Sequence, residues 1–508
     1  MASNIREALI GGVVCTVHAG LTTASAIVCT AGRRDAHVAP STISVVFPSL
    51  GAAVIAPNAT FTYVDRWSSL DTWGGAAPPA EGDSVVIPPG QNILLDVSPP
   101  RLNLILVLGR LAVEDARDVN IDASYIFVRG GSFAVGTESA PFTHKAVITL
   151  HGTPKVTPEL PGYGAKNIAV RRGVLDLHGA PVTPTWTQLA RTAHAGATSI
   201  DLAHGAVSWQ PGDEIVIASS SFDMEEAEKM TIASVAAAAG SGPSVVTLTA
   251  PLKFAHFAEV VSYGGKEIDM RAEVGHLTRR VVVRGDDSSE RHKWGAHIML
   301  HSPGDESTVG RLSYVECHLC GQAFNLGRYP IHFHMIGAVR KSYVKGCAVH
   351  RTFNRAVTIH GVHHFRVLDN VAYDNMGHAF FIEDAAETHN RVEGNLGLVT
   401  RASSSLLDTD TTPATFWITH PTNYFVGNVA AGSERYGFWF DLQRFATGPS
   451  ADERVCPPGS PLGSFVNNRA HSNGRYGLRI FNHWVPRANP CDWQSAVSEA
   501  NPLVGTDG

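Results

Sequence analysis

The chain has 508 residues, of which 44% are hydrophobic and 17% are charged, so it can bury an ample core in more than one domain. These values exclude a short peptide, a collagen and a disordered chain. The content of 48 Gly and 29 Pro, with few charges, favours a turn-rich β protein over a helical bundle. A net charge of −6 leaves no basic excess for phosphates, so nucleic-acid binding is not predicted.

Residues 1–60 are expected to form a leader and a linker. The segment from Ala8 to Cys29 carries no Lys, Arg, Asp or Glu, and it contains the small-residue run Ala24-Ser25-Ala26. This pattern favours a secretory signal peptide, with an uncleaved membrane anchor and a structureless leader as the alternatives. Asn58-Ala59-Thr60 is a glycosylation sequon, which matters if the chain is exported.

The seven cysteines are too few for a disulfide scaffold of this length. Cys317 and Cys320 form a single CxxC motif without a second pair at zinc-ribbon spacing. We therefore expect core or disulfide cysteines here and not a zinc or redox site.

Short apolar runs separated by Gly, Pro and Asp follow one another from Trp67 to Gly152, for example "DSVVIPPG", "LILVLGRL" and "KAVITLHG". Strand punctuation at about 10-residue spacing is typical of a β-sandwich or a β-solenoid. Beyond residue 310 a repeat appears, in which "DNVAYDN", "GNLGLVT", "GNVAAGS" and "NNRAHSN" share an Asn followed by alternating apolar residues. Spacings of about 22 to 26 residues, longer where a loop intrudes, predict a right-handed parallel β-helix.

Side chains alternate between the two faces of a strand, so the aligned second strands can be divided into inward and outward columns. The expected core columns are Ile331 and Phe333, Val357 and Ile359, Phe380 and Ile382, Phe416 and Ile418, and Phe438 and Phe440. One outward row holds His332, Thr358, Phe381, Trp417 and Trp439. The next outward row holds His334, His360, Glu383, Thr419 and Asp441.

His334, His360 and Glu383 fall on consecutive rungs of this second row. Rungs lie about 4.8 Å apart, so the three side-chain tips can converge on one metal ion or share protons. Two His and a carboxylate are a recognised metal grouping, and His beside Glu serves acid–base chemistry. We predict His334, His360 and Glu383 as metal ligands and His360, Glu383 and Asp441 as catalytic groups, with a solvated His/Glu face as the alternative.

Aromatic residues flank this row. Phe381, Trp417 and Trp439 offer flat apolar faces beside ionisable groups, as a groove for a sugar chain requires. Arg328 and Arg355 lie near these strands and can pair with the carboxylate of an acidic sugar. We predict all five as substrate-binding residues, and the alternative is that a loop covers the rings as additional core.

Long motifs also carry a family resemblance. The region from Trp67 to Gly152, with "EGDSVVI", "LILVLGRL", "NIDASYIFVRGG" and "AVITLHG", resembles the eight-glycine (G-eight) domain. Downstream, "GRYPIHFHMIG", "FNRAVTIHG", "GHAFFIEDAAETHN" and "AAGSERYGFWFD" resemble the family of cell migration-inducing and hyaluronan-binding proteins and transmembrane cell-surface hyaluronidases. More distantly, the chain resembles fibrocystin-like receptors.

The resemblance implies a G-eight domain followed by a β-helix, a secreted or cell-surface location, and a role in binding or depolymerising hyaluronan that is linked to calcium. The His and carboxylate residues of the predicted site are also compatible with a zinc-type ion, which is the alternative to calcium. Two departures stand out: the family's hyaluronidases carry an inserted globular domain after the strand corresponding to 175–179, where this chain has only about 30 residues before Trp209, and they continue through more coils beyond Asn482.

Together these observations predict an all-β chain with a leader and linker (1–60), a β-rich G-eight domain (61–180), a connecting region with the start of the solenoid (181–290), β-helix repeats (291–490) and a tail (491–508). The predicted function is hyaluronidase-like depolymerisation of an acidic polysaccharide, with a glycoside hydrolase preferred to a lyase. Glu383 and Asp441, two rungs or roughly 10 Å apart, favour inversion over retention. A noncatalytic glycan-binding or adhesion module with a structural metal and a purely structural solenoid are the alternatives, and membrane contact is expected only through the N-terminal anchor.

Overall fold

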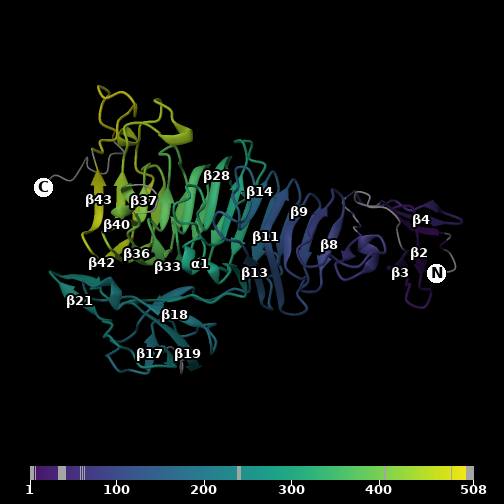
Figure 1. The fold of residues 1–508 in the computed structure, drawn as a ribbon, viewed down its shortest axis with the longest axis horizontal. Coiled ribbons are helices and arrows are strands. Elements are labelled where there is room, and N and C mark those ends of the chain that lie inside the picture. Colours follow the sequence, from purple (N-terminus) through teal and green to yellow (C-terminus); the bar gives the residue numbers. More distant parts are fainter. Residues whose placement is uncertain are drawn as a thin grey trace.

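The computed structural model describes residues 5, 7–32, 42–57, 59, 61, 63–236, 242–404, 408–481 and 483–498. Asn58, the predicted glycosylation site, lies outside these residues. The described chain is almost entirely β and forms a long parallel β-helix, with a small antiparallel sheet at its N-terminal end and a β-rich insert along one side (Figure 1).

Three ladders of parallel strands build the β-helix, and each ladder forms one face. The first runs through β6 (Asp65–Arg66), β8 (Asn92–Leu95), β10 (Arg110–Val113), β12 (Ser132–Val135), β15 (Val174–His178), β26 (Val309–Ser313), β29 (Tyr343–Lys345), β32 (Arg366–Leu368), β35 (Arg391–Glu393), β38 (Tyr424–Val426) and β41 (Ser464–Val466). The second, called the site face, runs through β7 (Ser84–Ile87), β9 (Leu102–Val107), the later half of β11 (Val119–Arg129), β14 (Asn167–Arg171), β25 (His297–His301), β28 (Ile331–Ala338), β31 (Val357–His363), β34 (Phe380–Ile382), β37 (Ala414–Ile418), β40 (Tyr436–Asp441) and β43 (Tyr476–Phe481). The third, called the insert face, runs through the first half of β11, β13 (Ala146–Leu150), β24 (Val281–Gly285), β27 (Val315–His318), β30 (Ala348–Thr352), β33 (Val371–Met376), β36 (Leu396–Arg401), β39 (Val429–Ser433) and β42 (Arg469–Asn473).

One continuous apolar core fills the solenoid from Trp67 to Leu442. It contains all the predicted inward columns, from Ile331 and Phe333 to Phe438 and Phe440. The predicted alternation is therefore confirmed, because a parallel stack keeps each inward side chain above its equivalent in the preceding coil.

The Asn of the sequence repeat forms an internal ladder at the turn before the insert face. Asn370, Asn395, Asn428 and Asn468 lie on successive coils, and each of the first three donates from its side-chain Nδ2 to the Oδ1 of the next at 2.9–3.0 Å. Each Oδ1 of the last three also accepts the backbone N–H of the preceding Asn at 3.0 Å. The repeated Asn thus satisfies buried backbone groups where the strands turn.

The solenoid begins earlier than we expected. The first ladder starts at Asp65–Arg66 and pairs continuously with later coils, so the region expected to form the G-eight domain builds the first coils of the same β-helix. Residues 181–290, expected to form a connecting region with the start of the solenoid, hold the insert and, after it, the solenoid strand β24. The solenoid therefore starts at β6, because the strands of the early region pair in the same parallel way as those of the repeats.

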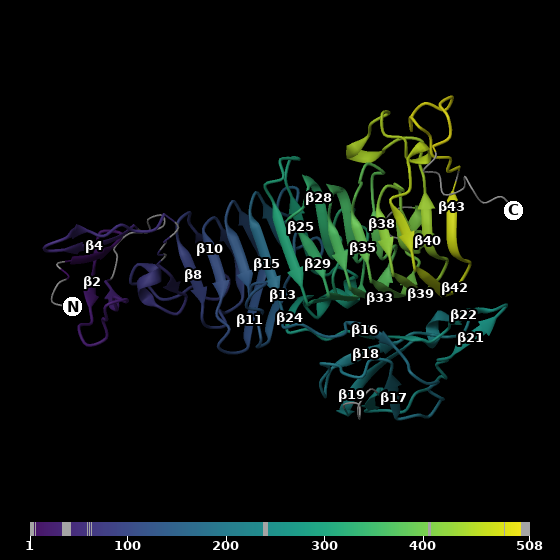
Figure 2. The same ribbon diagram turned by 180° about the vertical axis from the view of Figure 1, so that it is seen from behind.

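The insert is an antiparallel sheet with its own core around Trp209 and Ile215. Its strands lie in the order β16 (Trp186–Gln188), β23 (Glu273–His276), β18 (Glu214–Ile217), β19 (Glu228–Ala236), β20 (Ser244–Leu248) and β17 (Ser199–Leu202), with a hairpin of β21 (Val260–Tyr263) and β22 (Lys266–Asp269). Figure 2 shows the insert beside the later coils. Its Val216 and Leu277 share a buried cluster with Val371, Leu396 and Val429 of the insert face.

The described part of the segment predicted as a leader is folded into β-strands. It forms a sheet of β1 (Glu7–Ile10), β2 (Val13–Val17), β3 (Cys29–Ala31), β4 (Ile43–Phe47) and β5 (Gly51–Ala52). Cys15 and Cys29 are joined by a disulfide, which fixes the β2–β3 pair. Within the described part of the chain, no helix is long and apolar enough to span a membrane.

Of the remaining cysteines, Cys317 lies in β27, and the others lie in connections, as the short helices of the described chain do. Cys317 pairs with Cys320 and Cys456 with Cys491, while Cys347 is free and buried. The CxxC motif is therefore a buried disulfide, as expected. The short helices are α1 (Ser288–His292) and the 3-10 turns η2 (Leu70–Trp73), η3 (Met224–Glu226), η4 (Asp408–Thr411), η5 (Gly448–Ser450) and η6 (Pro457–Gly459).

Candidate functional site: a buried histidine–carboxylate centre

Strand register brings the predicted histidines together on the site face. β28 and β31 pair His332 with Thr358 and His334 with His360. The aromatic row continues from Thr358 to Phe381, Trp417 and Trp439 through the next strands. The outward rows derived from the repeat are thus the rows that the structure has.

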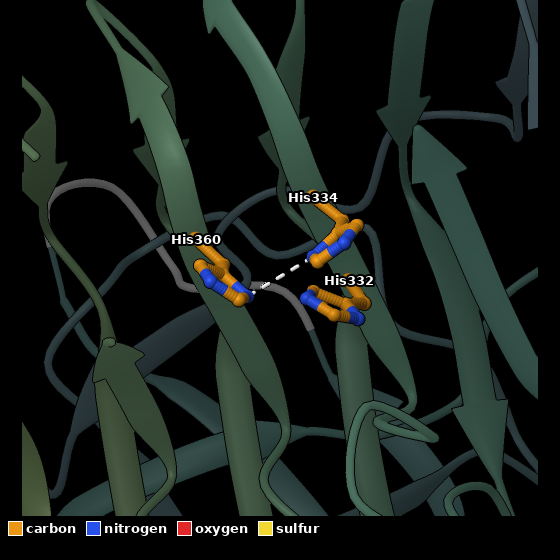
Figure 3. A group of neighbouring side chains, drawn as sticks. All are labelled: His332, His334 and His360. Carbon is orange, nitrogen blue, oxygen red and sulfur yellow. Dashed lines mark hydrogen bonds between the residues drawn. The ribbon is translucent and has the colours of Figure 1, made fainter. Parts of the chain in front are cut away.

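His332, His334 and His360 form a compact group, with one potential ligand atom of each lying within 4.8 Å of the others (Figure 3). The Nδ1 atoms of His334 and His360 are 3.0 Å apart, and the Nδ1 of His360 also lies 3.1 Å from the Oε2 of Glu383. We call these four residues and Asp384 the histidine centre. The structure brings together all three predicted metal ligands and adds His332, which had been assigned only to the aromatic row.

Carboxylates hold the His360 ring from both sides. Its Nε2 lies 2.8 Å from the Oδ2 of Asp384, opposite the Nδ1 that faces Glu383. Burial opposes protonation of His360, but the hydrogen bonds to Asp384 and Glu383 outweigh it and raise its pKa to about 10. Burial and the neighbouring His360 lower the pKa of His334 to about 3. Without a metal, the pair therefore consists of a charged donor, His360, and a neutral acceptor, His334.

Asp384 of the centre, and Tyr329 beside it, are not among the predicted site residues. Asp384 is buried, and it accepts from the backbone N–H of Ser450 at 3.1 Å as well as from His360. Tyr329 donates its hydroxyl to the Oε1 of Glu383 at 3.1 Å, and burial raises the pKa of this phenol. Adjacency of Asp384 to Glu383 was the available signal, because the strand ends at Ile382 and both carboxylates can turn toward His360.

A bulge aims His334 at its partner. The β28–β31 register shifts between His334 and Gly337, where Met335 adopts φ 52°. Bulges re-aim side chains next to functional sites, and a non-glycine residue in this region carries a conformational cost. Met335, the residue that carries this conformational cost, directly follows His334 of the histidine centre.

The donor set of the centre fits a zinc-type ion better than calcium. Calcium prefers oxygen ligands, whereas this centre offers imidazole nitrogens and one carboxylate. The Nε2 of His332 is buried without a hydrogen-bond partner, while its Nδ1 lies 3.0 Å from the carbonyl of Gly327. His360 faces the other histidines with Nδ1 and bonds Asp384 with Nε2. A carboxylate bound to the second nitrogen of a histidine in this way orients metal-binding histidines in other proteins.

The aromatic row is core and not an open groove. Phe381, Trp417 and Trp439 are only 3%, 4% and 6% exposed and pack with Ala414 and Tyr436. Our expectation that these rings stack on a sugar is therefore wrong for the structure as it stands. The rings are additional core, and the guanidinium groups of Arg355 and Arg479 lie 3.8 Å and 4.1 Å from the ring centroids of Phe381 and Trp439.

Arg355 is likewise unavailable to a substrate. It is fully buried and pairs through Nε and Nη2 with both carboxylate oxygens of Asp410 at 3.2 and 2.8 Å. Its guanidinium also lies 3.8 Å from the Phe381 ring centroid. A buried, bidentate partner satisfies this cation, so the assignment of Arg355 to substrate binding is corrected to a structural role.

Arg328 and Asp441 lie at the borders of the centre. Arg328 is half-buried and donates from Nη1 to the carbonyl of Gly162 at 3.3 Å. Asp441 is buried, and it accepts from Gln443 at 2.6 Å. Its strand, β40, is separated from β34 by β37, so Asp441 makes no direct contact with Glu383.

Within the centre only His334 and Glu383 are half-buried, which makes them the members that face solvent.

Fold and site together define a parallel β-helix protein with a buried histidine–carboxylate centre on one face. The family model of the G8 domain matches residues 72–190, and that of the CEMIP beta-helix matches residues 293–478. The chain is therefore one of the proteins that combine a G8 domain with a CEMIP-type β-helix, and the predicted resemblance is confirmed.

Relatives bear this out over long alignments. The chain is 45% identical to fibrocystin-L of Homo sapiens over 468 residues, covering 84% of this chain and 11% of the relative. It is 36% identical to the human cell surface hyaluronidase CEMIP2 over 326 residues, covering 55% of this chain and 23% of the relative. The human cell migration-inducing and hyaluronan-binding protein is 33% identical over 352 residues, with 60% and 25% covered. The chain thus spans a quarter or less of these relatives.

Proposed function

We propose that this chain binds an acidic polysaccharide of the hyaluronan class at the histidine centre and cleaves it there. The observation that carries the proposal is the convergence of His334, His360 and Glu383 on one point, with Glu383 and His334 half-buried and facing solvent. The 36% identity to a relative named as a cell surface hyaluronidase supports the choice of substrate.

The residues of the centre divide the work. Glu383, held by Tyr329 on one oxygen, exchanges the proton with the substrate: it protonates the leaving oxygen in hydrolysis or removes the proton beside the uronate carboxylate in a lyase reaction. Asp384 fixes the ring of His360. A zinc-type ion held by His332, His334 and His360 would act as a Lewis acid toward the substrate's oxygens. For hydrolysis, Asp441 would have to leave Gln443 to act as the second carboxylate, and its place two rungs away favours inversion.

We also propose a secreted or cell-surface location. The three disulfides among the described residues are those of a chain that folds in an oxidising compartment. The similarity to a cell surface hyaluronidase of Homo sapiens supports this location.

Chain-length analysis of hyaluronan and other uronate polysaccharides tests the activity. Purified protein is incubated with each polymer, with zinc, calcium or a chelator, and absorbance of unsaturated ends is followed. Shortening with new unsaturation identifies a lyase, and shortening without it a hydrolase. Glu383→Gln should slow shortening by at least about 100-fold. His389→Ala, which alters an exposed histidine stacked on His364 away from the centre, is the matched control and should leave the rate unchanged.

A noncatalytic glycan-binding module is the second candidate. It is favoured by the position of Asp441, which is buried and bonded to Gln443, so that no second carboxylate faces Glu383 across an open space. Retained hyaluronan binding without shortening of any polymer, with both metals supplied, would decide for this candidate and against cleavage.

A further inference from the structure

A second cluster of metal-binding side chains lies on the insert face. Glu316 and His318 belong to β27 and His350 to the next strand, β30, where it pairs in register with His318. One ligand atom of each lies within 4.8 Å of the others. The cluster is built on a different ladder from the histidine centre, so the two groups share no residue.

Both imidazoles converge on one carboxylate oxygen. The Nδ1 of His318 lies 2.9 Å from the Oε1 of Glu316, and the Nε2 of His350 lies 3.3 Å from the same oxygen. The two rings stack with centroids 5.4 Å apart and planes inclined by 25°. Ligands at about 2.0–2.1 Å from a tetrahedral ion are about 3.3 Å from one another, so these spacings are those of a ligand set.

The surroundings hold the ligands in place. The other carboxylate oxygen of Glu316 accepts the backbone N–H of Arg279 at 2.9 Å, which orients the group from behind. His350 is 3% exposed, and its Nδ1 is buried without a hydrogen-bond partner. The side chain of His318 is 19% exposed and provides the route from solvent.

Neighbouring cations have other partners. Arg279 is buried and donates its guanidinium to the Nδ1 of His276 at 2.9 Å and to backbone carbonyls. Arg284 pairs in register with His318, but its guanidinium faces Thr149 at 3.4 Å and Asp287 at 3.7 Å. The hydrogen bonds that these two guanidinium groups make within the described chain go to acceptors other than the shared oxygen of Glu316.

We infer that Glu316, His318 and His350 form a binding site for a divalent transition metal of the zinc type, separate from the histidine centre. The ion replaces the two N–H···O contacts with direct bonds and joins two successive coils. Three protein ligands leave a further position, which opens toward solvent beside His318.

Zinc binding to the whole chain tests this inference. Protein stripped with a chelator is titrated with Zn²⁺, and bound zinc per chain is measured by mass spectrometry of the metal, with Co²⁺ absorption as a second readout. His318→Ala removes the most exposed ligand, so the fold should persist, and it should weaken one zinc site by at least about tenfold. Glu316→Gln, which keeps an acceptor for Arg279, should have the same effect.

A matched control separates this site from other histidine–carboxylate pairs. His471 bonds Glu273 at 2.8 Å on the same face, and among the described residues no third ligand joins them, so His471→Ala should leave zinc binding unchanged. His334→Ala reports on the histidine centre independently, because it should remove the other ion and spare this one. Wild-type zinc content and affinity in both His318→Ala and Glu316→Gln would overturn the inference.

Discussion

At the residue scale, the centre depends on side chains that orient others. Asp384 is buried, fixes the ring of His360 through Nε2 and is itself fixed by the backbone N–H of Ser450. The Nδ1 of His360 therefore points at His334 and Glu383 without freedom to rotate. The affinity of the centre for a metal ion should therefore depend on Asp384 as well as on the residues that contact the ion.

Asp384→Asn should weaken zinc binding at the centre by about 10-fold to 100-fold, because Asn keeps an acceptor for His360 but loses the charge that makes the ring a stronger ligand. Zinc competition with a chromophoric chelator, performed in the His318→Ala background, measures this change. Asp287→Asn, at a 97% exposed side chain, is the control. Wild-type affinity in Asp384→Asn would mean that the centre binds no metal through His360.

Glu387 should give the protein a stability that declines as the pH rises. Burial raises its pKa to about 7, although the N–H groups of Gly361 and Asp384 donate to its Oε1. A carboxyl whose folded pKa is raised binds more protons folded than unfolded, so stability is lost as pH rises from the unfolded value toward 7. Glu387→Gln imitates the protonated form and should be more stable than wild type at pH 8.

Urea denaturation at pH 5 and pH 8 measures this effect. The variant and wild type should differ little at pH 5, and the variant's midpoint should exceed the wild type's at pH 8. Glu290→Gln, at an exposed side chain, should show no such divergence. Parallel pH profiles for Glu387→Gln and wild type would contradict the expectation.

At the element scale, the repeat could be predicted from sequence because a coil imposes two local rules. Inward side chains must be apolar, and the turn before the insert face requires a residue that bonds its neighbours above and below. His334 and His360 could be placed on adjacent rungs by counting from these two rules. The pairing of Arg355 with Asp410 could not be predicted in this way. Asp410 lies 55 residues further along the chain, in a connection that does not follow the repeat.

The asparagine ladder makes a stability prediction. Asn395 is buried and bonds Asn370, Asn428 and the carbonyl of Val367. Asn395→Ala should reduce the free energy of unfolding by about 2–4 kcal/mol, because several buried groups lose their partners at once. Chemical denaturation checks this, and Asn103→Ala, at an exposed position, should cost less than about 0.5 kcal/mol. Equal midpoints for the two variants would show that the ladder does not stabilise the stack.

The covering of the site face illustrates what a column pattern leaves open. Phe381, Trp417 and Trp439 occupy outward positions, as counted, and yet they are buried. An outward position is exposed only if no other segment packs on it. Here side chains of neighbouring coils, among them Arg355 and Arg479, pack on the rings, and the column pattern does not specify these contacts.

At the scale of the whole molecule, the insert is a second folding unit attached to the solenoid along one face. It was not foreseen because its antiparallel strands resemble, in sequence, the solenoid strands on either side. Its attachment is partly apolar, through Val216 and Leu277 on Val371 and Leu396, and partly polar, through the bond from Trp186 to the carbonyl of Gly394 at 2.6 Å. A unit with its own core can separate from the solenoid without unfolding it.

Val216→Asp should detach the insert. Val216 is fully buried in the shared cluster, and an unpaired carboxylate there favours the state in which this face meets water. Small-angle X-ray scattering should show an increased radius of gyration, while zinc binding at the histidine centre on the other face persists. Ser234→Asp adds the same charge at an exposed position of β19 and should leave the radius unchanged. An unchanged radius in folded Val216→Asp would mean that the polar contacts alone hold the insert, and loss of zinc at the centre would mean that the two faces are coupled through the core.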